Sequence, residues 1–342
     1  MQLDVVIDAR PLVGNRTGIG VHTAEIARRL PVSPPPLLAS HAAIENTSHL
    51  EHCRFRVDRS PLGVIWQQTR LPRIDANVLW GPHGTLPVAL RIPAVATLHD
   101  FTSITMPGRH KLKTILSFNL FIGRSLELAT RVACVSRAVA EEAMRGFGMP
   151  ASKLEIVPNG VDDFFSPGGE EQDYVLFVGT LEPRKGLDDL LTVWPMLPPP
   201  RPRLVICGDA GWGNVERELR ALGEVELTGF VDNERLRDLY RGAMAFVYPS
   251  RHEGFGIPPL EAMACGAPVI ATRTGAIPEF GKDVALLIAP GDLEGLRTSL
   301  TRVIRDASLR RELRLLGPER ARRYRWERSS ELMLALLAEA AR

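Results

Sequence analysis

The sequence has no strong excess of charge of either sign. Its 342 residues carry a formal net charge of only +2 at pH 7. Proteins that bind nucleic acid through their overall charge are much more basic, so a basic surface here must be a local patch. We expect a small-molecule partner and no nucleic acid.

Cysteine is scarce and widely spaced. The four cysteines form no Cys-x-x-Cys pair and have no cluster of histidines nearby: Cys53, Cys134, Cys207 and Cys265. This spacing argues against a zinc site and favours reduced, mostly buried thiols. It is typical of a cytoplasmic protein.

Long apolar runs are also absent. Nowhere do about 18 apolar residues follow one another, as a membrane-spanning helix needs. Residues 1–30 lack the basic start, apolar core and small-residue cleavage site of a secretion signal. We expect a cytoplasmic protein with at most peripheral contact with the inner face of a membrane.

The sequence does contain short apolar runs that alternate with helical patterns. In the first half these runs end in small or polar residues, like strands buried on both faces of a parallel sheet: 3–8, 77–81, 94–100 and 131–136. Helical patterns accompany them at about 22–30, 111–129 and 137–146. The first half is therefore predicted to be doubly wound α/β.

A polar, turn-rich stretch at 166–173 interrupts the alternation, which then starts again. We predict an α/β fold of two Rossmann-like domains facing each other across a cleft, with ligands beyond the carboxyl ends of the strands. The first domain spans 1–165 and the second 166–318. Residues 319–342 have the pattern of one amphipathic helix that crosses back onto the first domain.

Two glutamates, Glu253 and Glu261, lie eight positions apart around a turn with Gly254 and Gly256. The following prolines suit a first helical turn, so backbone N–H groups at this helix start are available to anionic oxygens. Ionised carboxylates only accept hydrogen bonds and therefore suit the vicinal hydroxyls of a sugar. Taken alone, the spacing more often belongs to a capped helix with one solvated glutamate.

Arg184 and Lys185 follow one predicted strand and precede a helix. Cations are disfavoured at a helix N-terminus by the helix dipole, which points to a functional reason for two of them. Together they suit a diphosphate, because they can offset the charge that grows on a leaving nucleoside diphosphate. The alternative is a solvated basic turn.

In order and spacing, these segments resemble the retaining glycosyltransferases of family 4, which have the two-domain GT-B fold. The resemblance spans nearly the whole chain. It is carried by six segments: 16–20, 98–100, 135–136, 157–162, 179–186 and 253–269.

The resemblance implies a role for each matching position on the donor side. Arg184 and Lys185 would hold the donor diphosphate, Glu253 would lie beside the transferred sugar and Glu261 would bind the ribose hydroxyls. Backbone N–H groups would complete the site, from Gly18 and Gly20 in the first domain and from Phe255, Gly256 and Ile257 in the second.

The first domain also supplies candidates at strand ends. The resemblance implies that His99 touches the sugar near the reacting face and that Asp100 orients or activates the acceptor, although a histidine at a strand end is as often only structural. His83 and Asp209 also follow strands and are weaker candidates.

Asp232 bears on the choice of nucleotide. Its carboxylate can accept two hydrogen bonds from guanine, whereas uracil offers one N–H donor. That favours a GDP-sugar such as GDP-mannose, which similar family members use. The alternative is that Asp232 caps a helix that begins near Glu234.

Mechanistically, the sequence shows no separate nucleophile. We expect a front-face reaction in which the departing phosphate oxygen takes the proton of the acceptor; a double displacement through Glu253 is the alternative. No Asp-x-Asp motif is present, so we expect no metal and no cofactor besides the nucleotide sugar.

Other functions are less consistent with the sequence. A dinucleotide oxidoreductase lacks support because Gly18-x-Gly20 has no third glycine. A UDP-sugar-dependent transferase, an epimerase or phosphorylase of the same fold, and a silent nucleotide-sugar-binding module stay as alternatives.

The acceptor is a hydroxyl compound of unspecified class. The basic residues 109–113 and the apolar residues 115–122 suit a membrane surface and hence a lipid-linked acceptor. We favour the alternative that this segment is a core helix with a solvated end.

Overall fold

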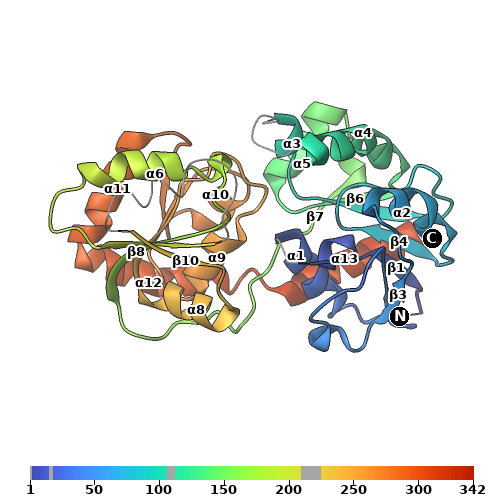
Figure 1. The fold of residues 1–342 in the computed structure, drawn as a ribbon, viewed down its shortest axis with the longest axis horizontal. Coiled ribbons are helices and arrows are strands. Elements are labelled where there is room, and N and C mark those ends of the chain that lie inside the picture. Colours follow the sequence, from blue (N-terminus) through green and yellow to red (C-terminus); the bar gives the residue numbers. More distant parts are fainter. Residues whose placement is uncertain (1, 15–17, 106–111, 209–224) are drawn as a thin grey trace. The chain divides into compact units, whose positions relative to one another are not determined.

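The structure, a computed structural model, describes residues 2–14, 18–105, 112–208 and 225–342. The chain divides into two compact units, one formed by Met1–Gly160 and Arg325–Arg342 and the other by Val161–Tyr324. Each unit contains one parallel sheet with helices packed against it (Figure 1). The predicted α/β class with two Rossmann-like domains is confirmed.

The first unit is built on a seven-stranded sheet of order β3-β2-β1-β4-β5-β6-β7, in which all neighbouring strands are parallel. The strands are β1 Val5–Asp8, β2 Leu37–Ser40, β3 Arg54–Val57, β4 Val78–Gly81, β5 Ala94–Leu98, β6 Arg131–Cys134 and β7 Leu154–Ile156. Every residue of β1, β4 and β5 is buried. Burial on both faces explains why their sequences are apolar without alternation.

Helices of the first unit come from both ends of the chain. They are α1 Gly18–Ala27, α2 Gly63–Thr69, α3 Thr102–Thr105, α4 Leu112–Leu128, α5 Arg137–Phe147 and α13 Trp326–Ala340. Helix α13 packs against α1 and against β4, β5 and β6. Gly160 lies against the start of α13 so closely that a Cβ atom would approach the backbone nitrogen of Trp326 to 2.2 Å.

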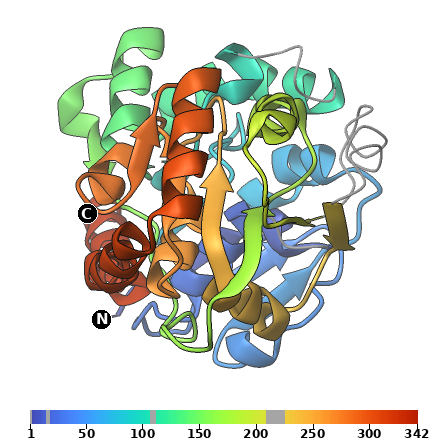
Figure 2. The same cartoon turned by 90° about the vertical axis from the view of Figure 1, so that its left-hand side faces the viewer.

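The second unit has a six-stranded parallel sheet of order β10-β9-β8-β11-β12-β13. Figure 2 shows β8 and β11 side by side at its centre. The strands are β8 Gln172–Val178, β9 Arg203–Cys207, β10 Val225–Gly229, β11 Ala243–Tyr248, β12 Val269–Thr272 and β13 Leu286–Ile288. The helices are α6 Leu187–Val193, α8 Asn233–Gly242, α9 Ile257–Ala264, α10 Ile277–Gly281, α11 Leu293–Arg305 and α12 Ala307–Ala321.

The predicted single helix over 319–342 is wrong. Helix α12 ends at Ala321 and α13 begins at Trp326. Between them Arg325 is extended, and the carbonyl of Tyr324 accepts a hydrogen bond from the backbone N–H of Val161 at 2.9 Å. The amphipathic pattern continues across this break because both helices bury one face, so periodicity alone does not reveal it.

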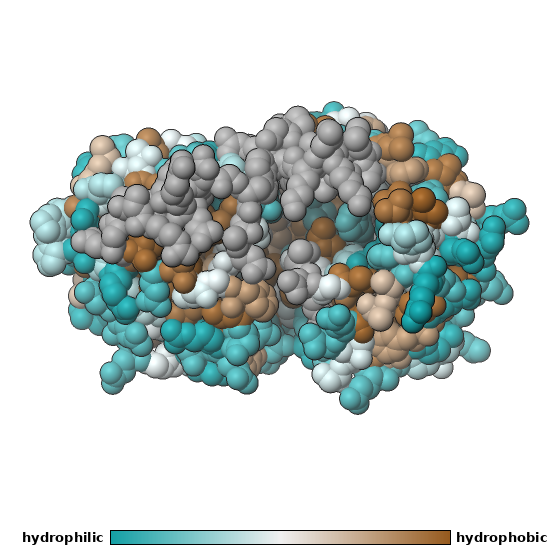
Figure 3. Space-filling model, viewed as in Figure 1, coloured by the Kyte–Doolittle hydropathy of each residue, from teal (hydrophilic) through white to brown (hydrophobic). Residues whose placement is uncertain are grey.

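The cores contain large aromatic side chains and all four cysteines. Trp66, Trp80, Trp194 and Trp326 are almost completely buried. The cysteines are buried and free, which agrees with the expectation of reduced thiols. On the face drawn in Figure 3, apolar side chains form small groups among hydrophilic ones. In the residues that the structure describes, no helix is both long and apolar enough to cross a membrane.

Candidate active site

The loops that follow β8 and β11 meet, because these strands are parallel neighbours and end at the same edge of the sheet. The first loop contains a short 3-10 turn, Pro183–Lys185. Its Arg184 carbonyl accepts hydrogen bonds from Arg251 N at 2.8 Å and from Ser250 Oγ at 3.2 Å. Gly186 has φ 69°, and a Cβ there would lie 2.0 Å from the carbonyl oxygen of Pro249, so only glycine fits.

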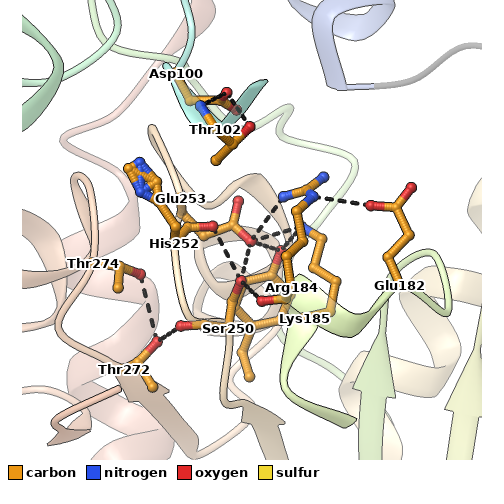
Figure 4. Close-up of polar contacts among 11 residues, drawn as sticks. Asp100, Thr102, Glu182, Arg184, Lys185, Ser250, His252, Glu253, Thr272 and Thr274 are labelled. Carbon is orange, nitrogen blue, oxygen red and sulfur yellow. Dashed lines mark hydrogen bonds and ion pairs between the residues drawn. The ribbon is translucent and has the colours of Figure 1, made fainter. Parts of the chain in front are cut away.

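This meeting of loops joins Glu253 to Lys185. Oε1 of Glu253 accepts hydrogen bonds from Lys185 Nζ at 2.7 Å and from Ser250 Oγ at 2.6 Å (Figure 4). The hydroxyl of Tyr248 donates to the same oxygen at 3.0 Å and accepts from Lys185 Nζ at 2.6 Å. Lys185 and Glu253 are only 8% and 9% exposed, so this ion pair is almost fully desolvated.

The ion pair sets the charge of both groups. Burial acts to raise the pKa of Glu253, but the charges of Lys185 and Arg184 and the hydrogen bonds to the carboxylate outweigh it and lower the pKa to about 2. Burial lowers the pKa of Lys185, and the negative charge of Glu253 opposes that shift. Glu253 is therefore ionised at neutral pH.

Two arginines flank the pair. Arg184 donates from Nε to Glu182 Oε2 at 2.9 Å, and its Nη1 lies 3.7 Å from Glu253 Oε1 (Figure 4). Arg251 binds Asp188 through two nitrogens, at 2.7 and 2.8 Å, and reaches Asp189 at 2.6 Å. It thereby fixes the loop to the first turn of α6. Sequence reasoning missed Arg251, whose signal was the pair of acids at the start of that helix.

Glu261 has a contrasting environment. It lies on α9, and its Oε2 accepts a hydrogen bond from the hydroxyl of Tyr240 at 3.1 Å. Burial raises its pKa to about 8, and the hydrogen bond from Tyr240 offsets that rise only in part. The two glutamates thus differ in protonation at neutral pH, which their sequence spacing does not indicate. The ribose-binding role of Glu261 stays a prediction.

The start of α9 agrees with the expected geometry. Gly256 is the N-cap with φ 94°, and prolines occupy the first turn as predicted. In the described part of the chain, no acceptor is bonded to the N–H groups of Phe255, Gly256 or Ile257. These groups are available to an anionic or hydroxyl oxygen. The side chain of Phe255 is core, 5.6 Å between ring centroids from Phe280.

Asp232 caps helix α8. Its Oδ1 accepts a hydrogen bond from the backbone N–H of Arg235 at 2.8 Å, and the side chain is exposed. The capping interpretation is therefore confirmed. Recognition of guanine stays a prediction that rests on the second carboxylate oxygen.

Gly18 and Gly20 are the first and third residues of α1, where the sequence predicted a loop before a helix near 22. Since the first four N–H groups of a helix have no partner within it, these glycines still present donors. Arg16, Thr17, Asp209 and the basic segment 109–111 lie outside the described residues.

His99 and Asp100 follow β5 in the first unit. His99 Nε2 lies 2.9 Å from the carbonyl oxygen of Pro82, so this nitrogen carries the proton and Nδ1 is the acceptor. Burial lowers the pKa of His99 to about 4, which keeps it neutral at pH 7. Asp100 Oδ1 accepts from the backbone N–H of Thr102 at 2.9 Å and from its hydroxyl at 2.5 Å, a turn at the start of α3 (Figure 4).

His22 was missed by sequence reasoning although it lies against His99. The two rings meet edge to face with centroids 4.8 Å apart. His22 is fully buried, and its Nδ1 lies 2.7 Å from Asn159 Oδ1. Burial, then the proximity of His99, lowers its pKa well below the usual value.

A second polar cluster in the first unit was also missed. Asp8, at the end of β1, is fully buried and binds Arg10 through both oxygens, at 2.9 and 2.7 Å. Gln67 Nε2 donates to Asp8 at 3.1 Å. Nearby, an open surface pocket of about 710 Å³ lies where β2 and β3 end, lined by residues 41–43, 57 and 59–61. His83 belongs to this region, since the charge of Arg10, after burial, lowers its pKa.

No group of three or more His, Cys, Asp or Glu in the described ranges is arranged to hold a metal ion.

The chain is similar to known glycosyltransferases throughout its length. Residues 16–163 match the family Glycosyltransferase Family 4, and residues 162–320 match Glycosyl transferases group 1. O-antigen chain mannosyltransferase B of Escherichia coli is 30% identical over 370 residues, which cover 95% of this chain and 97% of that protein. Serotype-specific mannosyltransferase WbdA of Escherichia coli is 28% identical over 60% of this chain, but the match spans only 25% of WbdA.

A solved structure supports the fold. Anabaena HepE in complex with UDP and glucose superposes with a TM-score of 0.81 at 19% identity, over 99% of this chain and 100% of that chain. Because the sheets, the family matches and a relative of nearly equal extent agree, this chain belongs to the family 4 glycosyltransferases and has the GT-B fold.

Proposed function

We propose that this glycosyltransferase moves a mannosyl group from GDP-mannose, or a closely related nucleoside diphosphate sugar, to a hydroxyl acceptor with retention of anomeric configuration. The observation that carries the proposal is the buried, ionised carboxylate of Glu253, held by Lys185. It belongs to the loop that leads into α9, where no described residue accepts from the N–H groups of 255–257. A carboxylate accepts hydrogen bonds from sugar hydroxyls, and the N–H groups suit the sugar and phosphate oxygens.

The departing diphosphate would meet Arg184 and Lys185. Lys185 has three N–H donors, and among the described residues two go to Glu253 and Tyr248, which leaves one for a phosphate oxygen. The bond between C1 and the phosphate oxygen breaks while the acceptor oxygen bonds C1 from the same face. The phosphate oxygen takes the acceptor's proton. The cations stabilise the charge that develops on the diphosphate.

We propose that no metal ion and no further cofactor take part, because two adjacent cations can supply the electrostatic stabilisation that a divalent ion gives in other transferases. The exposed carboxylate of Asp232 supports a guanine nucleotide, and the names of the mannosyltransferase relatives support a mannosyl group. HepE binds UDP and glucose, so a UDP-sugar is the alternative donor.

The acceptor is a hydroxyl of a glycan, a glycolipid or a small molecule. We place it in the first unit, where the open pocket beside β2 and β3 offers a surface for a hydroxyl compound. A lipid-linked acceptor is one form of this proposal. On α4, Leu120 is 73% exposed while Ile122 and Leu126 are buried, so the described part of that helix buries one face and exposes the other.

A thermal-shift panel of GDP, UDP, ADP and their sugars tests the donor. We expect GDP and GDP-mannose to stabilise the protein most. Asp232→Ala should abolish that preference, while Asp232→Asn separates the two roles of the residue: asparagine also caps a helix but lacks the second acceptor oxygen. Stronger stabilisation by UDP than by GDP would contradict the proposed donor.

A further inference from the structure

Glu253 is anchored through one of its two carboxylate oxygens. Lys185, Tyr248 and Ser250 all donate to Oε1. In the described ranges no residue is bonded to Oε2. One oxygen is thus fixed from several directions, and the other stays available to a ligand.

Tyr248 is packed in the core beside this carboxylate. It ends strand β11 and is fully buried. Its ring stacks with Phe177 and Phe246, at centroid distances of 6.2 and 5.9 Å. Because its hydroxyl accepts from Lys185 and donates to Glu253, one fixed oxygen orients both members of the ion pair.

Ser250 lies in the same loop as Glu253, between β11 and α9. It is fully buried, and its carbonyl accepts a hydrogen bond from the hydroxyl of Thr272 (Figure 4). Its hydroxyl has a single proton and three acceptors nearby: Glu253 Oε1 at 2.6 Å, Arg184 O at 3.2 Å and His252 O at 3.3 Å. The shortest contact goes to the charged oxygen, so the proton is donated to Glu253.

We propose that Tyr248 and Ser250 are positioning residues, which hold Glu253 by Oε1 so that Oε2 is the oxygen presented to the transferred sugar. The inference rests on the proposed function, since that proposal places the sugar at Glu253. Neither residue touches the sugar. They act by keeping the carboxylate in one rotamer, ionised and correctly directed.

The test compares Tyr248→Phe and Ser250→Ala with a matched control, Tyr174→Phe. Tyr174 is 3% exposed and donates to the carbonyl of Leu239 at 2.7 Å, so its variant also loses a buried tyrosine hydrogen bond, but away from Glu253. The assay is steady-state release of GDP from GDP-mannose by the full chain, or of UDP from UDP-glucose if the panel favours UDP. Rates are normalised to the folded fraction from melting curves.

We expect kcat to fall about 10- to 100-fold in Tyr248→Phe and Ser250→Ala, with the KM for the donor within about two-fold of wild type. Ser250→Thr retains the hydroxyl and should recover most of kcat. Because each lost donor makes the carboxylate easier to protonate, the acid limb of kcat should move to higher pH in both variants but not in Tyr174→Phe.

The proposal is overturned if Tyr248→Phe and Tyr174→Phe lose kcat equally, or if the donor KM rises while kcat and the acid limb stay unchanged. An incorrect donor would be recognised by a different result, in the thermal-shift panel. The panel would then favour UDP, and the variant comparison would still be made with UDP-glucose.

Discussion

Lys185 Nζ lies 2.7 Å from Glu253 Oε1 in an almost fully buried ion pair. The sequence assigns these residues to different parts of the donor, Lys185 to the diphosphate and Glu253 to the sugar. The structure joins them, so a diphosphate would meet a lysine already paired with a carboxylate. A substitution of either residue therefore changes the electrostatic environment of the other.

Replacing Glu253 should separate turnover from nucleotide binding. Glu253→Gln preserves size but removes the charge, so we expect kcat to fall about 100- to 1,000-fold. The Kd for GDP should stay equal or become lower, because Lys185 loses its counter-ion. Lys185→Met should lower kcat and also weaken GDP binding. Kinetics and calorimetric titration with GDP provide the two measurements, and an equal loss of GDP affinity in both variants would refute this division of roles.

Glu261 should make the free energy of unfolding fall as pH rises toward 8. Its folded pKa of about 8 lies above the unfolded value, so folding retains a proton that the unfolded chain releases. This contribution to stability is complete at acid pH and is lost as pH rises toward 8. Glu261→Gln removes the titration, and we expect its Tm relative to wild type to increase between pH 5 and 8 by about 2–4 °C or more.

The affinity for nucleotide should fall in Glu261→Gln, although the Tm of this variant rises. If Glu261 accepts from the ribose hydroxyls, Glu261→Gln weakens GDP binding even where it stabilises the fold. The parallel variant Glu253→Gln should not reproduce the pH-dependent gain, because the pKa of Glu253 is about 2. A Tm difference for Glu261→Gln that is constant between pH 5 and 8 would show that the buried carboxyl is not the titrating group.

A side chain at Gly186 should be poorly tolerated, because its Cβ atom would clash with backbone. Gly229, which has the same φ, serves as the matched control. Gly186 and Gly229 both have φ 69°, but an added Cβ meets the Pro249 carbonyl oxygen at 2.0 Å in the first case and nothing within 4 Å in the second. Gly229→Ala should cost about 1 kcal/mol of unfolding free energy from backbone strain alone. Gly186→Ala should cost about 2 kcal/mol more and also lower kcat, since it displaces Lys185. Equal midpoints in urea for the two variants would contradict the close packing of these loops.

Removal of divalent ions should leave transfer intact. Arg184 and Lys185 provide the positive charge that the leaving diphosphate needs, so activity in EDTA should stay within about two-fold of that in buffer. The measurement is GDP release before and after chelation. Complete loss of activity with rescue by manganese would show that a metal is required.

The central strands were predictable because burial on both faces produces short apolar runs, as in 94–98 and 203–207. Strands such as 54–57, where most residues are exposed, have no such run and were not predicted. Helix ends were harder. The start of α1 at Gly18 was not predicted, and the break at 322–325 lies where Tyr324 accepts a hydrogen bond from the distant backbone N–H of Val161. The periodicity of the local sequence does not indicate such contacts.

The residues of the site also differ in whether the sequence predicts their neighbours. Lys185 and Glu253 could be placed together in outline, because both follow parallel strands. Tyr248 and Ser250 were missed because nothing in a short apolar strand or a loop serine indicates which carboxylate oxygen it will bind. The opposite protonation of Glu253 and Glu261 also depends on the neighbours that folding brings to each.

The proposed activity is retaining transfer from GDP-mannose. The most direct measurement is time-resolved proton NMR of mannose released by the full chain from GDP-α-mannose, recorded before mutarotation and compared with UDP-glucose as donor. We expect GDP release with the α-anomer appearing first, and release about 100- to 1,000-fold slower by Glu253→Gln. First appearance of the β-anomer, or turnover of UDP-glucose in preference to GDP-mannose, would contradict it.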